Sequence, residues 1–287
     1  MKLLLSLALL AINCIALAQT PANLEQLVKD VAWNEWKDRE RNSFWQYRIQ
    51  QKIGQETFLK YQVETEQGPI YRILEKDGQR LDEKQQQAED ARLNQLLNSP
   101  AALKKNRDDH LQDEERLQRL TKLMPEAFLY EAEGPPAGDL LTLKFRPNPA
   151  FKPPTYEARV FHGMAGSMVI NQRFKRLVAM HGTVIERIDF GFGLLGYVDK
   201  GGQFAIHREQ VSSTHWKTDL VEVHVSGRVV LFKSVSKDHY EARSQFQPVE
   251  AGITLAEARR LLDEAAAENQ AELLPEKDRP ATSSLSQ

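Results

Sequence analysis

Cysteine is nearly absent from this sequence, which contains only Cys14 among its 287 residues. A chain with one cysteine has no internal disulfide framework and no cluster of thiolates to hold a structural zinc ion. The chain beyond Cys14 also has no thiol that could act as a nucleophile. We therefore expect the fold to be stabilised by an apolar core alone.

An excess of charge of one sign is absent as well, because 38 Lys and Arg residues stand against 40 Asp and Glu residues. Proteins that bind nucleic acid usually carry a basic patch or a high isoelectric point, so no nucleic-acid partner is expected. Long apolar runs are missing beyond residue 18, whereas a membrane-spanning helix needs about 20 apolar residues. We expect no transmembrane segment in the mature chain.

The N-terminus has the three parts of a secretory signal. Lys2 supplies a positive start, residues 3–12 are almost all apolar, and Ala16-Leu17-Ala18 places small residues at the last and third-last positions. A retained membrane anchor is the alternative, but the apolar stretch is short for a span. We expect residues 1–18 to be a signal peptide that is cleaved after Ala18, which leaves a periplasmic protein without acylation at Cys14.

Short β-like segments separated by turn residues make up most of the mature chain. The clearest is 221–225, in which valine alternates with Glu and His, the pattern of a strand with one apolar face. Parallel strands would need crossover helices between them, which this part of the sequence does not offer. We expect antiparallel strands at 44–53, 56–64, 70–75, 128–133 and 140–145, and a further series within 156–246.

Three helical regions interrupt or flank these strands. An amphipathic helix begins at Asn23, and residues 82–124 form an inserted helical hairpin with Pro100 in the first turn of its second helix. Thr254 and Glu257 form a capping box that opens a C-terminal helix over 254–274. The expected fold is mainly β (α+β), with one β domain over 19–253 and a disordered tail over 275–287.

The segment Gly191-Phe192-Gly193-Leu194-Leu195-Gly196 matches the dinucleotide-binding pattern letter for letter. That pattern binds a pyrophosphate only where its glycines open a helix. Here residues 197–202 read as a strand and a tight turn. The glycines are therefore interpreted as positions where a β-strand bends or passes close to another backbone.

Other motifs with a chemical appearance lack the residues that the chemistry needs. Asp189-Phe190-Gly191 has the letters of a kinase metal-binding triplet, but no catalytic loop accompanies it. Ser167 follows Gly166 without the second glycine of a nucleophile elbow. The seven histidines show no zinc-protease spacing, although residues of different strands can converge. We predict no enzyme activity, no cofactor and no metal site, and keep a hydrolase as the third hypothesis.

Residues 154–204 resemble a group of exported bacterial proteins in the outer-membrane lipoprotein-sorting superfamily. This group includes the periplasmic carrier LolA and RseB-like proteins. The resemblance depends on these motifs: Met164 to Ile170, Arg176-Leu177, Gly182-Thr183-Val184, Phe190 to Gly193, Leu195-Gly196 and Lys200 to Phe204. It implies an antiparallel sheet curled into an incomplete barrel, with helices over its apolar concave side. The insert at 82–124 departs from this pattern.

The resemblance implies a non-enzymatic periplasmic carrier or sensor of an apolar ligand, such as a lipid or a lipoprotein acyl chain. An envelope protein-interaction module without a small ligand, docking through the charged insert, is the alternative. The apolar residues beside the glycines become the candidate ligand-binding residues, although each could simply fill the core. They are Met168, Ile170, Phe190, Phe192, Leu194 and Leu195.

Overall fold

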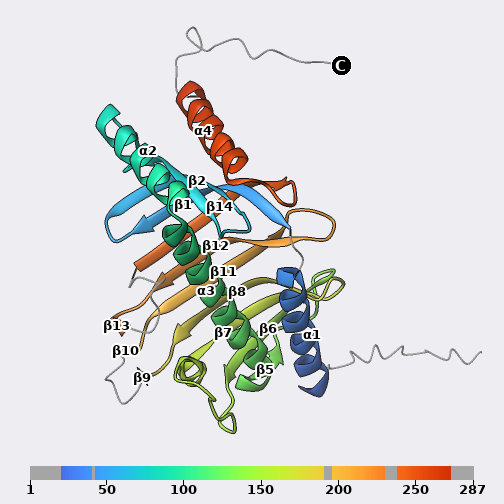
Figure 1. Cartoon of the computed structure of the whole chain (residues 1–287). Coiled ribbons are helices and arrows are strands. Elements are labelled where there is room, and N and C mark those ends of the chain that lie inside the picture. Colours follow the sequence, from blue (N-terminus) through green and yellow to red (C-terminus); the bar gives the residue numbers. More distant parts are fainter. Residues whose placement is uncertain (1–20, 41–42, 191–195, 230–237, 273–287) are drawn as a thin grey trace, which may run out of the picture.

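The computed structural model describes residues 21–40, 43–190, 196–229 and 238–272. Within them an antiparallel sheet of eleven strands runs in the order β4-β3-β2-β1-β14-β12-β11-β8-β7-β6-β5 (Figure 1). Its strands are β1 (Phe44–Ile53), β2 (Glu56–Val63), β3 (Ile70–Lys76), β4 (Gln79–Arg80), β5 (Phe128–Ala132), β6 (Leu140–Pro147), β7 (Met164–Asn171), β8 (Arg176–Val184), β11 (Gln203–Gln210), β12 (Trp216–His224) and β14 (Asp238–Val249). A small second sheet contains β13 (Gly227–Val229), β10 (Gly196–Val198) and β9 (Ile188–Phe190).

The helices form where the sequence supplies apolar stripes and caps. Helix α1 (Pro21–Glu40) comes first, and α2 (Glu83–Asn98), α3 (Pro100–Ala127), the 3-10 helix η1 (Glu157–Gly163) and α4 (Leu255–Glu272) follow. Asp82 caps α2 in a capping box, and Ser99 accepts a hydrogen bond from the amide of Ala102 at the start of α3. Thr254 and Glu257 form the expected capping box of α4, with 2.9 Å between the Thr254 amide and the Glu257 carboxylate.

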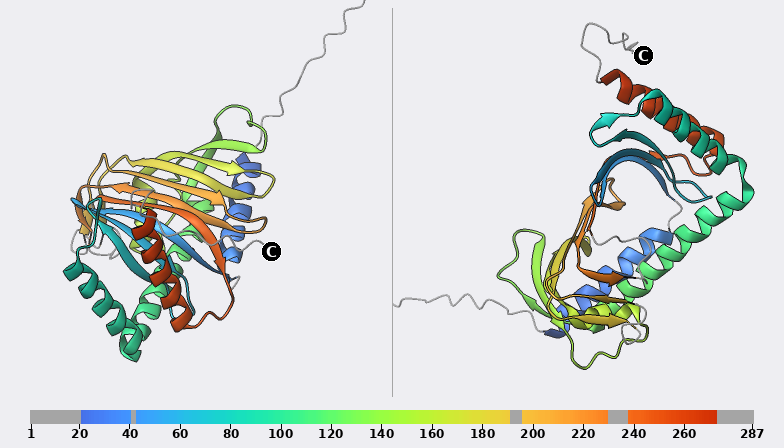
Figure 2. Two further views of the ribbon diagram at one scale, coloured as in Figure 1. Left: turned by 90° about the horizontal axis from the view of Figure 1, so that it is seen from above. Right: turned by 90° about the vertical axis from the view of Figure 1, so that its left-hand side faces the viewer.

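The helices cover opposite faces at the two ends of the sheet (Figure 2). Helix α1 and the C-terminal part of α3 enclose an apolar core over β5 to β8, and we call the covered face the inner face. Helices α2 and α4 enclose a separate core with Val63 and Ile70 of β2 and β3. Since Lys60 lies opposite Ile49 on the inner face, Val63 points to the other, outer face.

The expected α+β fold with an antiparallel sheet and N-terminal, inserted and C-terminal helices is confirmed. The sheet is not curled into the expected incomplete barrel. It is neither closed nor strongly curled, and its edge strands β4 and β5 lie at opposite ends. The inserted helices do not pack side by side as a hairpin along their length. They diverge from Ser99, so that α2 lies beside α4 and α3 runs toward α1 (Figure 2).

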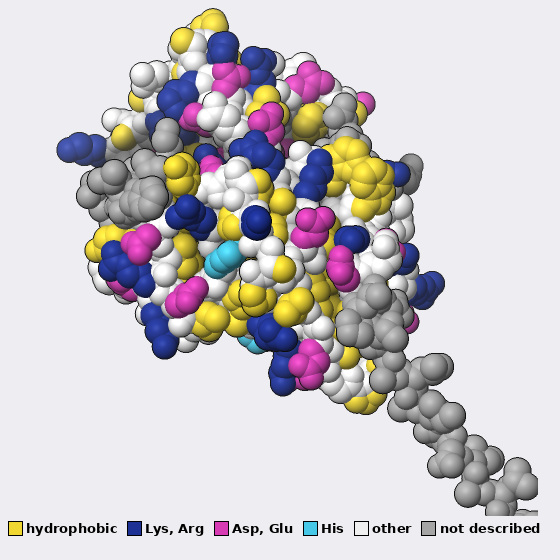
Figure 3. Space-filling view, turned by 90° about the horizontal axis from the view of Figure 1, so that it is seen from below, with side chains coloured by type: hydrophobic (Ala, Val, Ile, Leu, Met, Phe, Trp, Pro, Cys, Tyr) yellow, Lys and Arg dark blue, Asp and Glu magenta, His cyan; other side chains and the backbone are white. Residues whose placement is uncertain are grey.

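None of the helices in the described ranges combines the length and the apolar character that crossing a membrane requires. The expected signal peptide at 1–18 and the expected disordered tail at 275–287 lie outside the described residues, so both stay predictions. Figure 3 shows Lys and Arg side chains interspersed with Asp and Glu between patches of hydrophobic side chains. This mixture agrees with the balanced composition and gives that face no field of a single sign.

Candidate functional site

The three strands at the middle of the large sheet contain no fully buried residue. Every residue of β11, β12 and β14 is either half-buried or exposed, whereas the strands beside them hold buried core residues such as Ile49 and Met180. The central strands of a sheet are usually the ones most fully covered by packing. The middle of this sheet therefore lies between the two cores and is only partly covered: Phe204 of β11 packs against the inner core, and Phe246 of β14 packs against a cluster of Trp45, Tyr47 and Ile49.

An apolar strip lies on the inner face of these central strands. Its members, Phe204, Ile206, Val221 and Val223, are all half-buried. Ile206 lies opposite Met180 on β8 and opposite Val221 on β12, and Met180 belongs to the core beneath α1 and α3. Phe204 lies opposite Gly182, whose missing side chain leaves room for the aromatic ring. The apolar strip thus continues the inner core beyond the cover of the helices.

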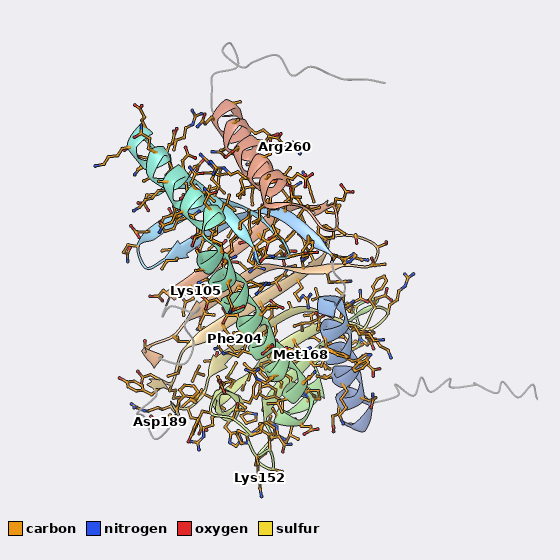
Figure 4. The ribbon with its side chains drawn as sticks, viewed as in Figure 1. Lys105, Lys152, Met168, Asp189, Phe204 and Arg260 are labelled. Atoms are coloured by element: carbon orange, nitrogen blue, oxygen red, sulfur yellow. The ribbon has the colours of Figure 1, made fainter. Side chains whose placement is uncertain are left out.

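Helix α3 crosses in front of the sheet and is fixed near its two ends (Figures 1 and 4). Near its start, the side-chain amide of Asn106 donates to the carbonyls of Gln67 and Pro69, each at 3.1 Å. Near its end, Leu120, Leu123 and Met124 pack against the inner core. Between these anchors Leu111 and Leu117 are 50% and 46% exposed. The middle of α3 therefore does not bury its leucines against the sheet.

A polar cluster, composed of Gln51, Lys60, His239, Glu241 and Arg243, borders the apolar strip on the inner face. Val221 lies opposite Glu241, and Val223 lies opposite His239. Glu241 accepts hydrogen bonds from Arg243 at 2.6 Å and from Gln51 at 3.0 Å. Burial lowers the pKa of His239 and the pKa of Lys60. On the inner face, β11 and β12 carry the apolar strip, β14 carries the charged Glu241 and Arg243, and β1 carries Gln51 beside the buried Tyr47 and Ile49.

Buried charges also fix α1 to the sheet. The Glu35 carboxylate on α1 pairs with Arg208 of β11 and lies 3.8 Å from Arg176 of β8. All three side chains are nearly buried, with exposed fractions of 7%, 12% and 10%. Burial lowers the pKa of Arg208 to about 10. One carboxylate shared by two guanidinium groups fixes the position of α1 beside the apolar strip.

The outer face carries a separate groove of about 620 Å³ over β5 to β8, lined by both apolar and polar residues. Here Ser167 Oγ lies 3.0 Å from Nε2 of His181, with Lys144 and Glu131 nearby in the lining. Among the described residues, no histidine has both a hydroxyl and a carboxylate hydrogen-bond partner, and no group of acidic, histidine or cysteine side chains is arranged to hold a metal ion. The groove therefore lacks the third group that orients a catalytic histidine.

The residues proposed from the sequence do not lie together in an open site. Met168 and Ile170 are 1% and 0% exposed in the inner core (Figure 4). Phe190 is fully buried in a third cluster with Val184, Ile188 and Val198. Phe192, Leu194 and Leu195 lie outside the described residues. Met168 and Ile170 do share the inner face with the apolar strip, because Met168 lies opposite Met180.

The glycine interpretation receives partial support from the described residues. Gly196 has a φ of +131° where β10 pairs with Phe190 and Val229, a conformation that side chains disfavour. A Cβ on Gly166 would lie 2.0 Å from the carbonyl oxygen of His181, so β7 and β8 approach closely there. Gly191 and Gly193 lie outside the described ranges.

Comparison of the chain with protein-family models, with curated proteins and with solved structures found no match. Sequence reasoning identified the alternation at Val221 and Val223 but did not select these residues as a site. The signal in the sequence was the alternation itself, which places both valines on one face of a strand. They were passed over because the candidate residues were chosen beside the glycine-rich segment.

Proposed function

We propose that this chain is a non-enzymatic envelope protein that binds an apolar chain, such as the acyl chain of a lipid or lipoprotein, on the inner face of its sheet. The observation that carries the proposal is the apolar strip at the middle of the sheet, which is half-buried and only partly covered by the inner core. The resemblance of residues 154–204 to lipoprotein-sorting proteins supports it. Export to the periplasm belongs to the same proposal and depends on residues 1–18.

We propose that the open sheet serves the role that the incomplete barrel serves in the arrangement implied by the resemblance. We propose that the sheet acts as a shallow half-barrel, with α3 as a bar across its inner face. Met168 and Ile170 then belong to the core beneath α1 and α3, next to the site. The residues that contact the ligand are those of the apolar strip. This assignment moves the ligand contacts from β7 to β11 and β12.

The energetics favour modest affinity. Burial of a methylene contributes about 0.8 kcal/mol, so ten of them contribute about 8 kcal/mol. Association costs about 4–15 kcal/mol, and an open strip buries less of each methylene than a closed cavity would. We therefore expect reversible binding, which suits a carrier or a sensor better than a storage protein.

The alternative of a protein-interaction module is favoured by a different observation. Leu111 and Leu117 of α3 are both largely exposed, and the space under α1 is filled by core side chains. A partner helix or loop could pack on these leucines without any small ligand. Loss of partner capture on Leu111→Ser, with unchanged acyl-chain binding, would favour this alternative.

Titration with a fluorescent fatty acid tests the proposal. We expect saturable binding by the full chain and a loss of about tenfold or more in affinity for the double variant Ile206→Gln, Val221→Gln, because two apolar cross-strand neighbours become polar. Leu220→Gln is the matched control, since Leu220 lies on the same strand but points to the outer face opposite His207. Equal affinities for the double variant and the control would refute the assignment of the apolar strip.

A further inference from the structure

The two cross-strand rows of the inner face change character at one strand boundary. One row reads Met168, Met180, Ile206 and Val221 and then continues as Glu241 and Gln51. The other reads Phe204 and Val223 and then continues as His239. Strands lie about 4.8 Å apart, so Gln51 is roughly 10 Å from Val221 across two strand spacings. The apolar strip and the polar cluster are therefore within the span of one amphiphile.

The polar cluster contains one positive charge, Lys60, that forms no ion pair within 4 Å of a carboxylate in the described part of the chain, although Glu241 and Glu89 act on it from further away. Lys60 Nζ lies 2.6 Å from the Gln51 side-chain oxygen and 4.6 Å from the centre of the Tyr71 ring. Both carboxylates that act on Lys60 are paired with another cation, Glu241 with Arg243 and Glu89 with Arg92. With His239 neutral, the charges of Lys60, Arg243 and Glu241 sum to one positive charge.

A partly buried ammonium without a counterion is costly, because burial removes its hydration. The lowered pKa of Lys60 reflects this desolvation. An aromatic face and an amide oxygen compensate only in part. An anion placed beside Gln51 would supply both the missing charge and a charge-assisted hydrogen bond.

We propose that the ligand of the inner face is an amphiphile with an anionic head group, whose head contacts Lys60 while its tail lies on the apolar strip. This inference rests on the proposed function and adds a head-group class to it. His239 and Arg243 border the head-group position from β14, and Glu241 holds Arg243 in place. A cationic head group would meet Lys60 and Arg243 without compensation.

Displacement of N-phenyl-1-naphthylamine, an apolar fluorophore, tests separately whether the apolar strip binds a tail and whether Lys60 selects an anionic head group. Dodecyl phosphate and dodecyltrimethylammonium have the same tail and opposite head charges. We expect dodecyl phosphate to displace the fluorophore from the full chain at about tenfold lower concentration, the effect of one charge-assisted hydrogen bond. Lys60→Met should abolish the difference between the two amphiphiles. Lys52→Met, which removes an exposed charge from the outer face of β1, should preserve it.

Each outcome bears on a definite claim. If the fluorophore binds and both amphiphiles displace it equally, the head-group inference is refuted while the apolar strip stands. Persistence of the phosphate preference in Lys60→Met would also refute it, provided that the variant melts like the parent. If the fluorophore does not bind saturably, the proposed function fails and the inference fails with it.

Discussion

Glu35 is the residue on which the position of α1 depends most directly. Its carboxylate is shared by Arg208 and Arg176, and all three side chains are nearly buried. Removing one member of a buried ionic group leaves the remaining charges uncompensated, which costs about 3–5 kcal/mol. We expect Glu35→Gln to lower the free energy of unfolding by about 3 kcal/mol in urea denaturation. Asp30→Asn, which removes a more exposed pair with Lys175, should cost less than about 1 kcal/mol; similar losses in the two variants would contradict this role.

His239 connects stability to pH at the border of the apolar strip. Burial is the main cause that lowers its pKa; Arg243 and Lys60 add to the lowering, and Glu241 opposes it. A histidine with a lowered pKa in the folded state stabilises the protein above its ordinary pKa of about 6.5, and this stability is lost as the pH falls through the folded-state pKa. We expect the Tm of the parent to fall more than that of His239→Gln between about pH 7.5 and 5.5. His181→Gln, at an exposed position, should keep the parental decrease, and parallel Tm curves for parent and His239→Gln would disprove the assignment.

At the scale of elements, α2 and the C-terminal part of α3 pack into the two cores, whereas the middle of α3 is exposed. Leu93 of α2 is fully buried with Ala258 and Leu262 of α4, whereas Leu111 in the middle of α3 is 50% exposed. We expect Leu93→Ala to cost about 2–5 kcal/mol of unfolding free energy, and Leu111→Ala to stay within about 0.5 kcal/mol. Chemical denaturation of both variants gives the comparison. A large loss in Leu111→Ala would show that the middle of α3 packs against the sheet.

The individual elements could be predicted from the sequence because their signals are local. The alternation at 221–225 indicates a strand, the stripe that begins at Leu24 indicates α1, and Thr254 with Glu257 marks the start of α4. The 3-10 helix η1 was missed, because its residues, 157–163, were assigned to the strand series expected within 156–246. Alternation shows that a strand has an apolar face, but it does not show which helix covers that face.

The candidate site could not be selected from the sequence for the same reason. Met168 and Val221 both occupy apolar positions of alternating strands, yet Met168 is buried beneath helices and Val221 is not. The difference arises from the register across the sheet and from where α3 crosses it. Lys60 and Glu241 are 181 residues apart in the sequence and share a face only through the pairing of β1 with β2 and β14.

At the scale of the whole molecule, the two cores lie on opposite faces at opposite ends of one sheet. Each core is closed by its own pair of helices, and these helices cover the central strands only in part: Glu35 of α1 reaches Arg208 of β11, and Phe204 packs against the inner core. This division of the cover explains why β11, β12 and β14 contain no fully buried residue. In this arrangement the apolar strip on β11 and β12 stays partly exposed, while both cores remain buried.

The central claim is that this surface is occupied by an amphiphile. Native mass spectrometry of the protein purified from an envelope fraction tests it most directly, because a bound amphiphile adds its own mass to the intact protein. We expect a population with one added mass in the range of a lipid or lipopeptide, and its loss in the double variant Ile206→Gln, Val221→Gln but not in Leu220→Gln. A folded protein that carries no added mass from that fraction, and takes up none when incubated with dodecyl phosphate, would contradict the account.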